Sequence, residues 1–312
     1  MVRYLPLCNT EIRYHLKVFL PHISIGGVVV ERLYSPVIML LFVAIFMGLS
    51  RSEVMASSQM KYFSDSCQAA REKFLQAAQE AGADIESFQN PHRGPQGEAL
   101  FTDVAIIGSK HAKDYLILGS GTHGVEGFAG SGIQTGLLRE GIHNELRPHM
   151  GLIMIHAINP YGFAHLRRSN EDNIDLNRNF IDHTKPYPGN EGYEKLADVI
   201  LPKSLSTWAD MKLQISLFWY RLKHGRAALK RAVSGDQFSH PTGMFFGGHH
   251  GTWSSKTLMK IAKRYLSNAK RVIFIDFHTG LGPFGGAEII LNSATDSPEY
   301  KRAVQMWGVL VR

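Results

Sequence analysis

The hydrophobic positions of this 312-residue chain predict alternating strands and helices from Met60 onward. Short apolar runs bounded by glycine and polar residues predict buried strands, and longer segments with one apolar face predict helices. The predicted strands cover residues 103–108, 115–119, 151–158, 271–278 and 287–292. The predicted helices cover residues 65–81, 133–138, 206–233, 255–270 and 298–307. This alternation predicts an α/β fold, a three-layer α/β/α architecture with a mostly parallel, mixed central sheet.

Local signals place the ends of several elements. Ser64 and Asp65 offer an N-cap for the first helix, whose Phe74 and Ala78 face inward, and Gly82 ends it. Gly225 is expected to break the long helical segment 206–233. The polar stretch 159–192 is expected to be a long loop at strand ends, where α/β proteins hold their functional sites.

The first 59 residues differ from the rest and are expected to be an N-terminal extension before a domain of residues 60–312. Residues 37–49 form an uncharged apolar run of thirteen residues, which allows three interpretations. The run could be read as a cleaved signal, as a membrane anchor that contacts the bilayer through residues 33–50, or as a translated stretch outside the native product. The first two interpretations predict an exported or membrane-anchored protein, and the third, with the native chain starting at Met60, predicts a cytoplasmic one.

Composition and charge exclude several classes of protein. Hydrophobic residues make up 44% and charged residues 20%, a soluble globular mixture that excludes a disordered chain, a collagen and a multi-span membrane protein. The net charge is +7, of which +5 belongs to residues 60–312, and the basic residues cluster in 212–231. The chain has no zinc-finger or RNA-binding motif, so no nucleic acid partner is expected. The cluster is interpreted as a solvated helix face, with an anionic partner as the alternative.

Candidate metal ligands follow two of the predicted strands. The two cysteines, Cys8 and Cys67, form no metal-binding spacing, so a metal would be held by histidine and carboxylate. His123 and Glu126 form an H-x-x-E sequence in a glycine-flanked loop after strand 115–119, and His278 closes strand 271–278. A catalytic zinc takes three protein ligands and leaves one position for water. These three residues are therefore the candidate set, although a single buried histidine is more often a hydrogen-bonded core residue.

The polar stretch between these strands carries arginine next to asparagine. Guanidinium and amide groups together suit the binding of a carboxylate, because they offer several donors in fixed directions. An isolated Asn-Arg-Asn sequence is otherwise an ordinary polar turn.

Five ordered segments together resemble the signature segments of the zinc metallocarboxypeptidases related to carboxypeptidase A. They are Gly-Thr-His-Gly-Val-Glu-Gly at 121–127, Asn-Pro-Tyr-Gly-Phe at 159–163, Arg-Arg-Ser-Asn at 167–170, Asp-Leu-Asn-Arg-Asn-Phe at 175–180 and Ile-Asp-Phe-His-Thr at 275–279. The resemblance covers roughly residues 103–292, and residues 60–65 resemble a poorly characterised bacterial branch of that superfamily. It implies a carboxypeptidase-like fold and a single zinc ion bound by His123, Glu126 and His278.

The resemblance also implies roles for residues of the polar stretch. Asn177 and Arg178 are expected to bind the terminal carboxylate of a substrate. Arg168 is expected to polarise the scissile carbonyl, with Arg167 as the alternative if the register is displaced by one residue. Asp175 is expected to orient a ligand imidazole.

The implied activity is zinc-dependent hydrolysis of an amide bond next to a free carboxylate, in a peptide or an acyl-amino acid. The family's general-base glutamate lies on a strand well downstream of the third ligand, and the only glutamates after His278 are Glu288 and Glu299. Three interpretations remain: the chain is C-terminally truncated, Glu288 serves as the base, or the protein binds zinc without catalysis. A deacylase of N-acyl amino acids is the alternative within the same superfamily.

Overall fold

The computed structural model describes residues 14–18, 59–109, 112–280, 288–291 and 293–308. They form two compact units. Unit 1 contains the described residues up to Arg168 and those from Leu258 onward, and unit 2 is Ser169–Thr257. The apolar run 37–49 lies outside the described residues. Within the described part of the chain, no helix is both long and apolar enough to cross a membrane.

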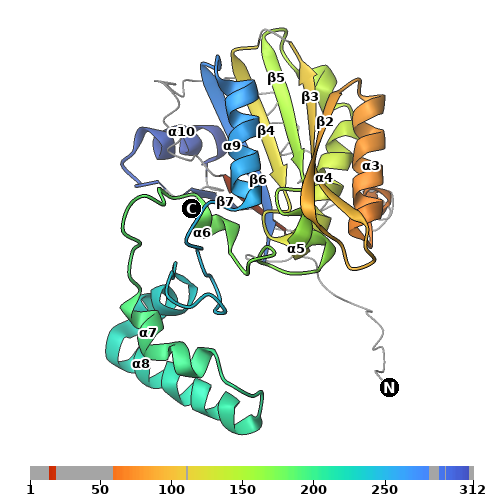
Figure 1. Ribbon diagram of the computed structural model, residues 1–312. Coiled ribbons are helices and arrows are strands. Elements are labelled where there is room, and N and C mark those ends of the chain that lie inside the picture. Colours follow the sequence, from red (N-terminus) through yellow and green to blue (C-terminus); the bar gives the residue numbers. More distant parts are fainter. Residues whose placement is uncertain (1–13, 19–58, 110–111, 281–287, 292, 309–312) are drawn as a thin grey trace. The chain divides into compact units, whose positions relative to one another are not determined.

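The described residues of unit 1 are built on a seven-stranded sheet with the order β2-β3-β5-β4-β6-β1-β7 (Figure 1). The strands are β1 (Tyr14–Val18), β2 (Asp84–Arg93), β3 (Ala99–Gly108), β4 (Asp114–Ser120), β5 (Met150–His156), β6 (Arg271–Thr279) and β7 (Ile289–Leu291). Strand β4 pairs in parallel with β5 and β6, and β1 pairs in parallel with β7. The other three neighbouring pairs are antiparallel. The sheet is therefore mixed, and its three innermost parallel strands put their C-terminal ends at one edge.

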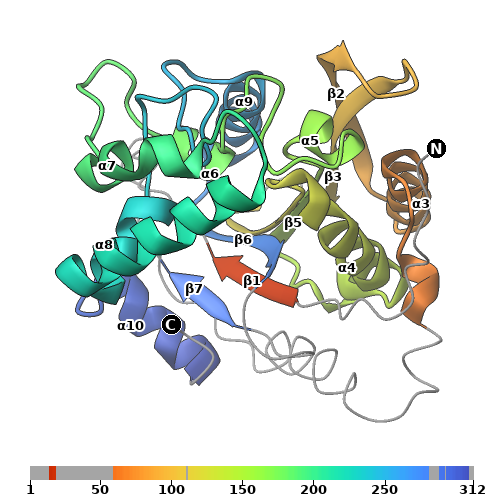
Figure 2. The same ribbon diagram turned by 90° about the horizontal axis from the view of Figure 1, so that it is seen from below.

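Helices cover both faces of this sheet (Figures 1 and 2). α3 (Cys67–Glu80), α4 (Gly127–Arg139) and α10 (Pro298–Trp307) pack in one apolar cluster with alternate strand residues. α9 (Trp253–Leu266) lies on the opposite face. Successive side chains of a strand point to opposite faces, and in β2 Ile85 packs in the cluster with α3 whereas Glu86 contacts Arg264 and Tyr265 of α9. The predicted three-layer α/β/α fold with a mixed sheet is confirmed.

The core of unit 1 fills the space between the sheet and α3 and α4. Its large, fully buried side chains include Phe74, Leu118, Leu152, Met154 and Phe277. Burying a side chain of this size contributes about 1.5–3 kcal/mol. This packing fixes the two helices against the sheet and thereby fixes the loops at the strand ends.

Short helices connect the strands of unit 1. They are η1 (Met60–Tyr62), η2 (Gly124–Glu126), η3 (Ile142–Glu145) and α5 (Pro160–Ala164). Unit 2 contains α6 (Leu176–Asn179), α7 (Glu191–Ile200) and α8 (Thr207–Ser234). α8 has non-helical backbone angles at Gly225, with φ 84°, so the predicted break is confirmed.

Several local features differ from the sequence prediction. Residues 14–18, inside the expected N-terminal extension, form strand β1 of the sheet, and the helix expected at 133–138 begins at Gly127 as α4. The first helix starts later, because Ser66 rather than Ser64 or Asp65 caps it by accepting a hydrogen bond from the Ala69 amide. Strand β2 was not predicted, since it is a mostly exposed edge strand without an apolar run. The stretch 159–192 is not one continuous loop, because α5 and α6 interrupt it and α7 begins within it.

Candidate metal centre

Three side chains of ligand type converge where β4 and β6 end. His123 follows β4, Glu126 is the N-cap residue of α4, and His278 precedes the last residue of β6. One ligand atom of each lies within 4.8 Å of the others. His123 Nδ1 is 3.0 Å from Glu126 Oε1, and His278 Nδ1 is 2.8 Å from Glu126 Oε2. The structure thus brings together the three residues that the sequence proposed as ligands.

A glycine in the H-x-x-E turn allows the neighbouring loop to approach it. A Cβ atom on Gly124 would lie 1.9 Å from the carbonyl carbon of Gly162, a distance that no side chain can occupy. The Gly124 amide donates a hydrogen bond to the Arg167 carbonyl at 3.1 Å. The segment around α5 is therefore packed directly on the turn, and this packing brings Arg168 to the cluster.

A second carboxylate orients one of the imidazoles. His278 Nε2 is 2.7 Å from Asp276 Oδ2, and that oxygen also accepts a hydrogen bond from the Thr122 hydroxyl at 2.7 Å. Since Asp276 binds Nε2, Nδ1 of His278 is left directed at Glu126. A carboxylate on the far nitrogen fixes the tautomer of a ligand histidine and increases its basicity. Asp276 is not among the site residues predicted from the sequence, although its position two residues before His278 in one strand places both on the same face.

The electrostatics of the cluster favour a positive charge between the carboxylates. Burial acts to raise the pKa of Glu126, but its interactions with His123 and His278 outweigh this effect, so that its pKa lies below the usual range. Burial acts to lower the pKa of His278, but Asp276 and Glu126 raise it to about 9. In the absence of a metal, a proton on His278 supplies this charge. A metal cation bound to the same nitrogen would replace that proton.

The cluster fits a divalent metal. Two imidazoles and one carboxylate are a donor set that zinc takes in catalytic sites. Ligand atoms at about 2.0–2.2 Å from a tetrahedral ion lie about 3.3 Å apart. The two contacts of Glu126 with the imidazoles, at 3.0 and 2.8 Å, are close to this spacing, and one ligand atom of each of the three residues lies within 4.8 Å of the others. His123 and His278 are both almost fully buried, which shields the site from bulk water.

Arg168 lies at the border of the cluster. Its Nη1 is 3.6 Å from Glu126 Oε1, and its side chain is 44% exposed. The neighbouring Arg167 contributes its backbone carbonyl to the turn, as described above. The guanidinium of Arg168 thus contacts a candidate ligand, while its role toward a substrate stays a prediction.

Asp175, Asn177 and Arg178 belong to unit 2. Asp175 is buried and caps α6, accepting a hydrogen bond from the Asn177 amide at 3.0 Å. Arg178 Nε lies 2.6 Å from Asp236 Oδ1, and its Nη2 donates to the Ser234 carbonyl at 3.1 Å. Their expected roles toward a ligand imidazole and a substrate carboxylate therefore stay predictions.

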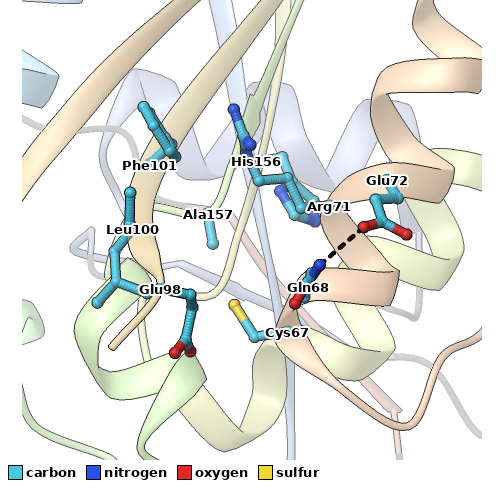
Figure 3. A pocket seen from close by; sticks show the side chains of 10 residues that line it. Cys67, Gln68, Arg71, Glu72, Glu98, Leu100, Phe101, His156 and Ala157 are labelled. Carbon is cyan, nitrogen blue, oxygen red and sulfur yellow. Dashed lines mark hydrogen bonds between the residues drawn. The ribbon is translucent and has the colours of Figure 1, made fainter. Parts of the chain in front are cut away.

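A separate cavity of about 180 Å³ lies in unit 1 beside the start of α3 (Figure 3). Cys67, Arg71, Phe101 and His156 are among its lining residues, and none of the three candidate ligands is. Burial raises the pKa of Cys67 to about 12, so this thiol stays protonated and is a poor nucleophile at neutral pH. The cavity is therefore distinct from the metal cluster and lacks an activated thiol.

Comparison with known families gives one assignment. Residues 63–312 match the family described as "Protein of unknown function (DUF2817)". The chain belongs to this family. No curated protein matches the chain.

Solved structures with some likeness to this DUF2817 chain have low sequence identity. The carboxypeptidase A of Helicoverpa armigera is 14% identical, with a TM-score of 0.37, and the match covers 66% of this chain and 44% of that one. Bovine thrombin-activatable fibrinolysis inhibitor, solved in complex with tick carboxypeptidase inhibitor, is 13% identical, with a TM-score of 0.40 and coverage of 77% and 68%.

Tannerella forsythia glutaminyl cyclase is 11% identical, with a TM-score of 0.29 and coverage of 81% and 93%. The chain spans less than two thirds of each of the first three solved structures found. With TM-scores below 0.5, these likenesses decide neither the function nor the ligands of this chain.

Proposed function

We propose that this DUF2817 chain is a zinc-dependent hydrolase that cleaves an amide bond next to a free carboxylate. The observation that carries the proposal is the convergence of His123, Glu126 and His278, with Asp276 on the far nitrogen of His278. The five signature segments described in the sequence analysis support the same chemistry. Zinc bound there would supply an activated water and polarise the substrate carbonyl.

The chain's own residues would act around that ion. His123, Glu126 and His278 would hold it, and Asp276 would keep the imidazole of His278 in the tautomer that leaves Nδ1 as a ligand. Arg168, near Glu126 and partly exposed, would donate hydrogen bonds to the oxygen that becomes negatively charged as the amide is attacked. Asn177 and Arg178 would bind the substrate's carboxylate.

The proposed hydrolysis also needs a group that accepts a proton from the attacking water. Among the described residues after His278, Glu288 is a buried carboxylate that immediately precedes β7. Strand β7 is joined to β6 through β1, so Glu288 lies at the start of a strand of the sheet that contains His278. We propose Glu288 as the group to test for this role.

A hydrolysis panel with matched substrates tests the proposal. The zinc-loaded chain is given N-acyl amino acids and short peptides, each with a free C-terminal carboxylate and each also as its C-terminal amide. We expect cleavage of the free acids and little cleavage of the amides, and loss of cleavage in His123→Ala. Zinc binding without cleavage of any substrate, or equal cleavage of acids and amides, would contradict the proposal.

The variant Glu288→Gln separates the two parts of the assignment. If Glu288 takes the proton, the variant loses activity while its zinc affinity is unchanged. If the variant keeps full activity, Glu288 is not the base, and the hydrolase assignment stands on the remaining residues.

A further inference from the structure

Helix α8 carries two apolar faces, and within the described residues only one of them is covered. Leu213, Leu217 and Tyr220 pack with Leu196 and Val199 of α7, and the two helices lie side by side (Figures 1 and 2). These positions follow the spacing of one helix face. This packing joins α7 to α8, and the part of the chain that the structure describes leaves the other side of α8 exposed.

The uncovered face is a continuous apolar stripe. Its members are large side chains that expose between 45% and 69% of their surface: Trp208, Met211, Ile215, Phe218, Trp219 and Leu222. Their spacing is three, four, three, one and three residues, which places all six within about 100° of the helix circumference. Single exposed apolar residues are normal on protein surfaces, whereas a stripe of this size marks an interaction surface.

The excess positive charge of residues 60–312 is concentrated in the same helix. α8 contains six basic residues and one acidic residue, so its net charge is +5. Residues 60–312 outside α8 contain equal numbers of basic and acidic residues. All six basic residues of α8 are exposed, and within the described chain none of them forms a salt bridge with a carboxylate. These residues are Lys212, Arg221, Lys223, Arg226, Lys230 and Arg231.

The charges border the apolar stripe. At 100° per residue, Lys212 and Lys223 flank it on one side and Arg221 lies beyond its other side. The helix runs without a break from Thr207 to Gly225, a length of about 27 Å at 1.5 Å per residue. An apolar face with tryptophan and phenylalanine, bordered by lysine and arginine, is the pattern of a helix that lies in a membrane interface.

We propose that α8 docks this DUF2817 chain on an anionic lipid surface, with the stripe in the interface and the basic residues at the headgroups. A second copy of the chain fits less well, because two copies joined through this stripe would bring the basic borders together without acidic partners. The tryptophans also favour lipid, since their amphipathic rings occupy the headgroup level. The proposal is independent of the hydrolase assignment and of the metal.

Vesicle binding of the full chain tests this directly. The chain is sedimented with vesicles of phosphatidylcholine, with and without phosphatidylserine. We expect binding to the phosphatidylserine vesicles, accompanied by a blue shift of tryptophan fluorescence, and little binding to the neutral ones. A chain that stays in the supernatant with both vesicles would overturn the proposal.

A first variant tests whether the apolar stripe of α8, rather than another segment, binds the vesicles. Ile215→Ser with Phe218→Ser and Trp219→Ser should reduce partitioning at least tenfold, while Val304→Ser, an exposed apolar control on α10, should not. If the serine variant binds as the parent chain does, α8 is not the docking surface.

The second variant tests the charges and leaves the stripe intact. Each basic residue near an anionic surface strengthens binding about fivefold. Lys212→Glu with Lys223→Glu should therefore reduce partitioning at least tenfold. The matched control, Lys263→Glu with Lys301→Glu, changes two exposed lysines elsewhere and should have a smaller effect. Equal losses in both pairs would show a general charge effect and would contradict a surface centred on α8.

Two further measurements distinguish lipid from protein as the occupant. Trp208→Phe with Trp219→Phe should keep the sedimentation and abolish the fluorescence shift, because these two tryptophans would be the ones that enter the interface. Sedimentation velocity without lipid should show a monomer. A dimer that the serine variant dissociates, or amide protection of α8 against hydrogen exchange that is lost in that variant without lipid, would assign the stripe to a protein contact and overturn the proposal.

Discussion

His278 and His156 stand at the C-terminal ends of two strands of one sheet and are both almost fully buried, but their surroundings differ. His278 lies between two carboxylates, Asp276 and Glu126, which raise its pKa to about 9. His156 stacks on the ring of Phe74 at 4.7 Å between centroids, and burial lowers its pKa to about 4.

The two histidines also point to opposite faces of the sheet. Phe277, next to His278, packs in the cluster with α3 and α4, so His278 points away from that cluster, whereas His156 contacts α3 through Phe74. Burial alone thus does not make a metal ligand. The convergence of carboxylates is what distinguishes His278 as a candidate ligand, because it supplies the negative charge that a cation needs and orients the imidazole.

Removing a ligand should have the largest effect. We expect His123→Ala to weaken zinc binding by more than about 100-fold, since loss of a residue that only orients a ligand already costs about 10- to 100-fold. Competition with a chromophoric chelator measures the affinity, and circular dichroism verifies the fold. The control His156→Gln should keep the parent's zinc affinity. Equal loss in both variants would remove the distinction between the two sites.

Asp276 should matter less than a ligand but more than a surface carboxylate. Asp276→Asn removes the negative charge that holds His278 Nε2, and we expect zinc affinity to fall about 10- to 100-fold. The exposed Asp182 provides the control, and Asp182→Asn should leave the affinity unchanged. An unchanged affinity in Asp276→Asn would mean that Glu126 alone orients His278.

His156 should make stability depend on pH. Its pKa of about 4 in the folded chain lies below the ordinary value of 6.5, so folding favours the neutral ring. The resulting stability is complete above pH 6.5 and is lost as the pH falls toward 4. Asp103 acts to raise the pKa and Arg71 to lower it, but burial dominates.

As the pH falls from 7 to 5, the titration of His156 should lower the free energy of unfolding by about 2 kcal/mol. Urea unfolding of the parent chain and His156→Gln at both pH values measures it. The variant should lose about 2 kcal/mol less than the parent over this interval. An equal loss in both would place the pH dependence on other groups.

The smallest expected effect concerns the partner of His156. Its Nε2 lies 2.9 Å from the Ser131 hydroxyl, so Ser131→Ala should leave that buried nitrogen without its hydrogen bond at a cost of about 1 kcal/mol. Urea unfolding at pH 7 measures this. Zinc affinity should not change. A change would mean that the packing around His156 on one face of the sheet affects the metal cluster on the other.

Much of unit 1 could be predicted from local patterns. Apolar runs located β4, β5 and β6 to within two residues at either end, and the predicted bounds of α10 agree with the structure. The H-x-x-E turn and the strand-end position of His278 nominated the three residues that converge. Strand β2 was not predicted, because an edge strand exposes most of its side chains and its sequence therefore lacks a periodic apolar pattern.

The sequence by itself determined which segments are apolar, where they end and which ligand types follow them. Only the tertiary structure decided that Asp276 meets His278, that Arg178 is held by Asp236 far along the chain, and that one apolar face of α8 stays exposed. The reason is physical. Periodicity reports the faces of an element from neighbouring residues, but which partner covers a face depends on how distant segments pack.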